Sequence, residues 1–187
     1  PTSREMINWV LANPRPAENA DMGLLDALEN MVYRDGMPPE SPGYNYIWTN
    51  GPAEIAALLG DEAGQLRAHS RWRRLLLWHY GTIVARKFQP PLGDSGDMFA
   101  GTSSLSPTVC RLALPYVTDR ALAAELRTIA GRQRDLFAQP LEDSAAQGDA
   151  PAPADPVSRN LPAYGLAMLQ NGPAQEPTAA VLHYGSW

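Results

Sequence analysis

Tyr44 is the residue of this 187-residue chain whose setting could make a side chain chemically reactive. It follows the stiff loop Asp-Gly-Met-Pro-Pro-Glu-Ser-Pro-Gly at positions 35–43. Ser41 is a typical helix N-cap and Pro42 a typical first helical residue, so the spacing predicts that Tyr44 lies in the first turn of a helix. The unpaired N–H groups of that turn would favour the phenolate over the phenol, which suits a tyrosine that acts as a general base.

The polar neighbours of Tyr44 could share in this chemistry. Glu40 could hydrogen-bond a ligand hydroxyl or orient Tyr44, and it could equally brace the loop or cap the helix. Asn45 has the same two interpretations. Tyr46 is the alternative to Tyr44, because two residues turn a helix by about 200° and the two phenols cannot face one cleft.

Two other polar groups also have a functional and a structural interpretation. Asp94 and Ser95 lie between glycines and could line a cleft or simply shape a turn. Arg67, Arg71 and Arg74 have the spacing of one helical face, which could bind carboxylates or sulfates or form a solvated surface.

Helices are the predicted elements that position most of these residues. Apolar residues at helical spacing predict helices near 3–12, 17–33, 42–60, 65–85, 108–117 and 119–137, with a kink or restart at Pro52 and Gly60 as a C-terminal stop. Residues 87–107 are predicted to be mostly loop. Residues 164–170 and 178–184 are predicted strands separated by a turn, and two strands alone imply a larger sheet.

Composition bounds the remaining possibilities. A net charge of −5 argues against wholesale binding of polyanions or nucleic acid, although local basic patches could still bind them. No apolar run approaches the roughly 20 residues of a membrane span. The single cysteine, Cys110, excludes an internal disulfide, and its apolar neighbours predict a buried thiol. Residues 140–160 are rich in Ala, Pro and Asp, which is typical of a linker between a helical portion at 1–139 and a β portion at 161–187.

These motifs, in their order along the chain, resemble the heparinase II/III family of polysaccharide lyases. The Asp-Gly, Glu-Ser and Gly-Tyr pairs at 35–44 resemble the signature that carries the family's catalytic tyrosine in its helical domain. Gly-Asp-Ser-Gly at 93–96, after two prolines, is similar to the family's Gly-Asp-Ser segment. Residues 161–169 and 181–185 are similar to the strands that open its β domain.

The resemblance implies a mainly α chain, part of an (α/α) toroid followed by the first strands of an antiparallel β-sandwich. It implies β-elimination on an anionic, uronic-acid-containing polysaccharide, with Tyr44 as the catalytic acid or base. The substrate-binding residues are then expected to be Glu40, Ser41, Asn45, Asp94 and Ser95. We expect no cofactor, no metal site, no nucleic-acid partner and no membrane span, and the family implies a periplasmic or secreted location.

The family's Asn-His pair and its glycine-flanked histidine are missing from the chain, so we expect an internal fragment of a larger enzyme, inactive by itself. His183 precedes the position of the family histidine and is not assigned its role. One alternative is a glycoside hydrolase on a similar toroid, with Glu40 and either Asp94 or Asp97 as acid and base. Another is a non-catalytic helical module that binds polysaccharide or another protein.

Overall fold

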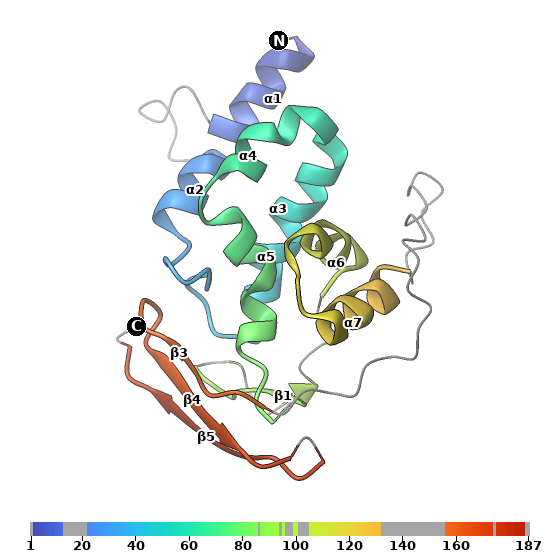
Figure 1. Cartoon of the computed structure of the whole chain (residues 1–187). Helices are drawn as coiled ribbons and strands as arrows, with labels where there is room; N and C mark the ends of the chain where they lie inside the picture. The colour runs from blue at the N-terminus through green and yellow to red at the C-terminus, as the bar shows by residue number, and fades with distance from the viewer. Residues whose placement is uncertain are drawn as a thin grey trace.

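The computed structural model describes residues 2–12, 22–85, 87–93, 95, 99–100, 105–131, 156–173 and 175–185. Within these residues the chain is about half helical, and a small three-stranded antiparallel sheet lies beneath the helices (Figure 1), which confirms the expected mixture of elements. The α-helices are α1 (Ser3–Ala12), α2 (Leu24–Asn30), α3 (Asn45–Leu59), α4 (Gly64–Ala68), α5 (Trp72–Gly81), α6 (Pro107–Ala113) and α7 (Arg120–Ala130).

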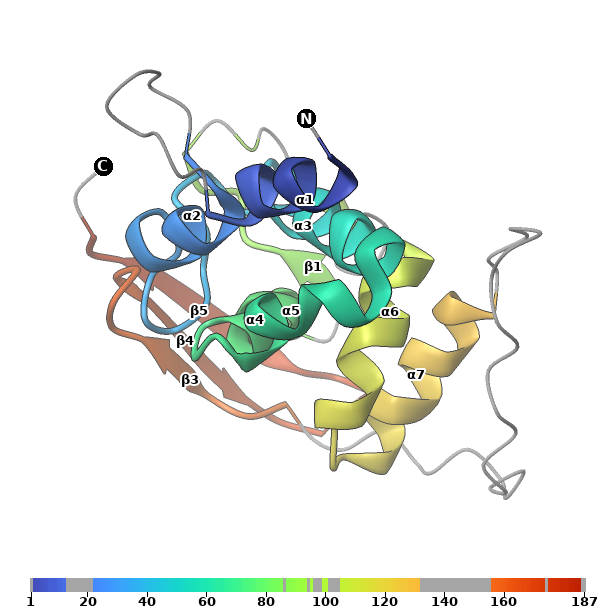
Figure 2. The ribbon, with the colours of Figure 1, turned by 90° about the horizontal axis from the view of Figure 1, so that it is seen from above.

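The sheet presents one face to the helices. Its strands are β3 (Arg159–Leu161), β4 (Leu166–Asn171) and β5 (Thr178–His183), hydrogen-bonded in the order β3-β4-β5. Along β4, Leu166 and Met168 are fully buried whereas Leu169 is 67% exposed, which is the alternation expected of a sheet with one covered face. Seen from the helical side, the sheet lies behind the helices (Figure 2).

One cluster of buried apolar side chains joins the helices to the sheet. It includes Trp72 and Leu126 from the helices and Leu166 and Met168 from β4. Cys110 is 0% exposed in the same cluster, which confirms the predicted buried thiol. Hydrophobic burial therefore docks the sheet onto the helices. No helix in the described ranges is long and apolar enough to cross a bilayer.

Local capping interactions fix several helix boundaries. Thr2 and Glu5 form a capping box at α1, in which the Glu5 N–H donates to Thr2 Oγ1 at 3.3 Å and the Thr2 N–H donates to the Glu5 carboxylate at 2.6 Å. At α7 the Leu122 N–H donates to Asp119 Oδ1 at 2.9 Å. Gly60, with φ of 55°, ends α3 as a glycine stop should.

Other predicted boundaries are wrong for reasons of tertiary structure. The helix predicted over 17–33 ends at Asn30, and its residues 17–21 lie outside the described residues. α3 continues through Pro52 as one helix, so of the predicted kink or restart the restart does not occur. β3 begins at Arg159, inside the predicted linker 140–160, because Arg159–Leu161 pairs with β4; residues 140–155 lie outside the described residues. Within the predicted loop 87–107, β1 (Phe88–Gln89) pairs with β2 (Phe99–Ala100).

The helix predicted over 65–85 is broken between α4 and α5. His69 leaves helical geometry with ψ of 133°, and α5 begins only at Trp72. The break places the guanidinium of Arg71 on the C-terminal end of α2, where it donates to the carbonyls of Leu28 (3.1 Å), Glu29 and Val32 (2.7 Å). The Leu28 and Glu29 carbonyls lie in the last turn of α2, where helical geometry leaves them without a partner in the helix, and a cation there also complements the helix dipole.

The predicted common face of Arg67, Arg71 and Arg74 therefore does not form. Arg71 caps α2, and Arg74 Nη1 donates to the carbonyl of Arg34. Arg73 Nη2 likewise donates to the carbonyl of Tyr116 at 3.2 Å. These arginines connect helices to loops, and Arg67 is exposed.

A buried polar group ties the end of α5 to β1. The carbonyl of His79 accepts hydrogen bonds from Thr82 Oγ1 at 2.9 Å and from Gln89 Nε2 at 3.2 Å. The His79 side chain is 1% exposed, and this burial lowers its pKa from 6.5 to about 4. The imidazole is therefore neutral in the folded protein at neutral pH.

Replacing Arg71 with methionine should lower the free energy of unfolding by about 2–3 kcal/mol, because the change removes charge-assisted hydrogen bonds and leaves α2 carbonyls without a partner. Arg67→Met, at an exposed position, is the matched control and should cost less than about 0.5 kcal/mol. Urea unfolding measures both. Equal losses at the two positions would show that Arg71 does not cap α2.

Acid should destabilise the protein through His79. Its pKa is lowered on folding, so between about pH 6.5 and 4 the unfolded chain binds a proton at His79 that the folded protein does not bind. The free energy of unfolding is therefore unaffected by His79 above pH 6.5 and falls by up to about 3 kcal/mol as the pH is lowered toward about 4. Urea midpoints between pH 7.5 and 4 measure the slope. His79→Gln should flatten it, whereas the control His69→Gln should retain it; the same slope in wild type and His79→Gln would exclude His79 as the cause.

Candidate functional site

Tyr44 borders α3 instead of lying in its first turn. The helix begins at Asn45, which makes Tyr44 the N-cap residue, so the predicted capping by the Ser41 side chain is wrong. The carbonyl of Ser41 accepts the N–H groups of Tyr44 at 2.9 Å and Asn45 at 3.0 Å, and residues 42–44 form a tight turn before the helix. The signature loop, residues 35–44, thus ends in a turn whose last residue is Tyr44.

The Tyr44 side chain is open to solvent. It is 46% exposed, whereas Tyr46 is only partly exposed. Glu40, four residues earlier, is also exposed at the surface of the loop. Among the predicted site residues that the structure describes, Tyr44 and Glu40 are the exposed ones, so a large ligand can reach their side chains, and Ser95 is partly exposed.

Asn45 and Ser41 are buried instead. Asn45 is 0% exposed, and its side chain closes the loop by accepting the Glu40 N–H at 3.0 Å and donating to the carbonyl of Pro38 at 3.2 Å. Ser41 is 1% exposed, and its hydroxyl has no hydrogen-bond partner within the described residues. Asn45 braces the loop, so contact of either side chain with a polysaccharide would require the loop to open.

Ser95 meets the signature loop beside Tyr44. Its hydroxyl accepts the Gly43 N–H at 2.9 Å across 52 positions of sequence. A side-chain carbon at Gly43 would lie 3.1 Å from Ser95, so the loop and the Gly-Asp-Ser segment are in close contact. Asp94 and Asp97 lie outside the described residues.

The sheet supplies a second set of contacts to the loop, which the sequence did not predict. Asp35 Oδ2 accepts the N–H groups of Ala163 at 2.9 Å and Tyr164 at 3.0 Å, in the turn between β3 and β4. The Tyr164 hydroxyl donates to the carbonyl of Glu40 at 3.1 Å. The only signal in the sequence is that Asp35 and Tyr164 both fall in the segments that carry the family resemblance.

Tyr164 remains protonated in this setting. Burial, followed by its neighbours Tyr33, Glu40 and Asp35, raises the pKa of its phenol. The Tyr164 ring lies edge-on to Tyr33 at 5.6 Å and tilted against His183 at 5.7 Å between ring centroids. A phenol that stays protonated and donates a hydrogen bond to a backbone carbonyl is suited to bracing the loop, not to acting as a base.

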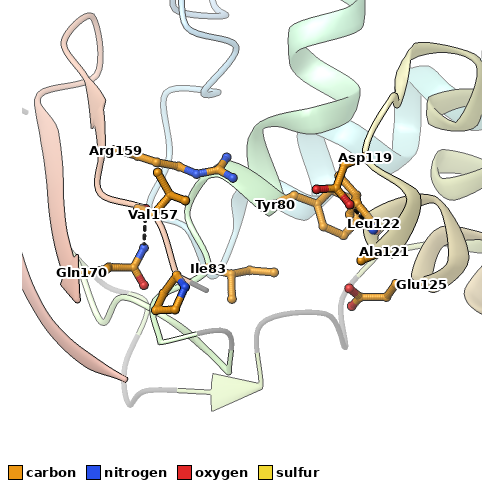
Figure 3. A pocket seen from close by; sticks show the side chains of 10 residues that line it. Tyr80, Ile83, Asp119, Ala121, Leu122, Glu125, Val157, Arg159 and Gln170 are labelled. Carbon is orange, nitrogen blue, oxygen red and sulfur yellow. Dashed lines mark hydrogen bonds between the residues drawn. The ribbon is translucent and has the colours of Figure 1, made fainter. Parts of the chain in front are cut away.

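A cavity of about 230 Å³ lies between the ends of α5 and β4 and the start of α7 (Figure 3). Asp119, Glu125 and Arg159 are the charged residues that line it, and none of its lining residues belongs to the signature loop. Asp119 already accepts the Leu122 N–H, and Gln170 donates to the Val157 carbonyl at 3.0 Å. The carboxylate of Asp119 and the amide of Gln170 hold the protein together, so this cavity is a weaker candidate than the surface around Tyr44.

Among the described residues no group of three or more His, Cys, Asp and Glu side chains is arranged to hold a metal ion. Comparison of the chain with protein-family models, curated proteins and solved structures finds no significant match. The geometry around Tyr44 is therefore the basis for any functional proposal.

Replacing Ser41 with alanine should leave the free energy of unfolding unchanged or raise it by up to about 1 kcal/mol, because a buried hydroxyl without a partner is already desolvated at a cost. Thr49→Ala is the contrasting control, since Thr49 Oγ1 accepts the Trp78 indole N–H at 2.7 Å and its loss should destabilise. Thermal unfolding measures both. A destabilised Ser41→Ala protein would mean that the hydroxyl has a partner.

Proposed function

We propose that this chain is part of a polysaccharide lyase that cleaves a uronic-acid-containing polysaccharide by β-elimination, with Tyr44 as the acid or base. The observation that carries the proposal is the Gly43 N–H to Ser95 hydroxyl contact of 2.9 Å. It joins two segments that independently resemble the same lyase family, and it does so at the residue before an exposed tyrosine. On this proposal the helices belong to an (α/α) toroid and β3–β5 open a β-sandwich.

The reaction has three requirements, and Tyr44 is proposed to meet the two that are proton transfers. A base must remove the weakly acidic proton beside the uronate carboxylate, the carboxylate must be neutralised, and the leaving glycosidic oxygen must receive a proton. Tyr44 can perform the proton transfers, because its phenol is accessible and fixed to a braced loop. The family's Asn-His pair and glycine-flanked histidine do not occur in the 187 residues, so the proposal requires a longer protein to supply them.

Two other classes of function compete with the lyase. A toroid-fold glycoside hydrolase would pair Glu40 with Asp94 or Asp97, and of these three carboxylates the structure describes only Glu40, which is exposed. A binding module would need the same exposed surface but no proton transfer. The lyase is favoured because the resemblance and the contacts around Tyr44 converge on one residue.

In a protein that includes the flanking coding sequence, Tyr44→Phe should lower kcat at least about 100-fold, because the phenol hydroxyl carries the proton transfer. Tyr46→Phe, two positions away, is the matched control and should keep most of the activity. The measurement is the ultraviolet absorbance of the unsaturated uronate released from an anionic polysaccharide.

Other outcomes identify the competing functions. A saturated sugar end would indicate the hydrolase, and binding without turnover would indicate the binding module. Loss of activity in Tyr46→Phe, with Tyr44→Phe unaffected, would move the catalytic role to Tyr46.

A further inference from the structure

Three hydrogen bonds connect the signature loop to the turn between β3 and β4. Asp35 Oδ2 accepts two N–H groups of that turn, from Ala163 and Tyr164, and the Tyr164 hydroxyl donates a hydrogen bond to the carbonyl of Glu40. The turn therefore donates all three hydrogen bonds and the loop accepts them. The two segments are distant in sequence, since 124 positions separate Tyr164 from Glu40.

Docking of the sheet does not need these bonds. Leu166 and Met168 are fully buried in the cluster shared with the helices, and the Tyr164 ring itself is 4% exposed in that cluster. Apolar burial is non-directional, so it brings the sheet to the helices without fixing where the loop backbone lies. The polar bonds act on the loop backbone at Glu40, and through Asp35 on the start of the loop.

The contacts continue from Glu40 to Tyr44. The Glu40 peptide is held on both sides, by Tyr164 at its carbonyl and by Asn45 Oδ1 at its N–H. Asn45 directly follows Tyr44, and Gly43, directly before it, is held by Ser95. A shift of the Glu40 carbonyl would therefore be passed to the backbone on which Tyr44 sits.

We propose that Asp35 and Tyr164 form a clamp through which the C-terminal sheet positions the loop that carries Tyr44. Both are positioning residues for the reaction of the preceding subsection, on which the catalytic half of this inference rests. Neither contacts the reacting atoms, and Tyr164 acts through the Glu40 carbonyl. The sheet is then required for alignment of Tyr44 as well as for burial of the core.

Tyr164→Phe tests the clamp with a small change, because phenylalanine keeps the ring against Tyr33 and His183 and removes the hydroxyl that donates to the Glu40 carbonyl. Tyr184→Phe is the matched control. It also removes a phenol hydroxyl from the end of the sheet, but that hydroxyl donates to Asn160 Oδ1 at 2.7 Å and does not touch the loop.

The first readout is amide hydrogen exchange of this chain in peptides that cover residues 38–46. Tyr164→Phe should speed exchange there about fivefold to tenfold, the effect of losing one hydrogen bond, while peptides from α5 and α7 keep the wild-type rate. Tyr184→Phe should leave 38–46 unchanged. Unaltered exchange in Tyr164→Phe, or equal acceleration in both variants, overturns the clamp.

The second readout is lyase activity in the longer protein. Tyr164→Phe should lower kcat about tenfold with KM within twofold of wild type, and with a melting temperature close to that of Tyr184→Phe. Wild-type kcat in Tyr164→Phe would overturn the positioning role even if exchange in the loop is faster. If the wild-type protein has no lyase activity, the proposed function fails and the exchange experiment alone decides whether the clamp exists.

Discussion

The peptide groups of the signature loop must find hydrogen-bond partners away from water, and the arrangement around Tyr44 follows from this requirement. Met37, Pro38, Ser41 and Asn45 are all buried, so much of the loop backbone lies inside the protein. A buried peptide group without a partner costs roughly 1–3 kcal/mol. The loop joins no sheet, so side chains from elsewhere supply many of its partners: Asn45 from α3, Tyr164 from the sheet and Ser95 from the segment after β1.

The position of the sheet depends on the same requirement. The two N–H groups of the turn between β3 and β4 point to the Asp35 carboxylate, which lies in the loop. The last residue of that turn, Gly165, has φ of 84°, and a side-chain carbon there would lie 2.4 Å from Gly185. Only glycine permits this close approach between the residue that precedes β4 and a residue just beyond the end of β5. Hydrophobic burial brings the sheet and the helices together, and the polar contacts fix the position of the turn between β3 and β4 relative to the loop.

Charged side chains follow a similar rule at the helix ends. The spacing of the arginines could serve a polyanion, but Arg71 instead satisfies carbonyls at the end of α2, where helical geometry leaves them without partners. Arg73 and Arg74 also donate to backbone carbonyls. Glu40 keeps an exposed carboxylate while its backbone is held on both sides. In the signature loop, the candidate site residues Glu40 and Tyr44 combine an exposed side chain with a backbone held by hydrogen bonds, whereas most of the structural residues there have buried side chains.

Features that depend on near neighbours in the chain could be predicted from the amino-acid sequence. Apolar periodicity located the helices, Thr2 and Asp119 marked helix starts, Gly60 marked a stop, and the apolar setting of Cys110 indicated a buried thiol. Each of these signals acts within one or two turns of chain, where the residues that cause the structure are adjacent in sequence.

Tertiary structure alone decided the features whose partners are distant. The break before Arg71 and the contacts of Asp35 with the turn between β3 and β4 each depend on groups tens of residues away. Local periodicity cannot predict them, because the free energy gained by satisfying a remote carbonyl or N–H exceeds the small differences in propensity that set a helix boundary. Tyr44 could therefore be singled out from its sequence, but the polar contacts that hold its loop could not.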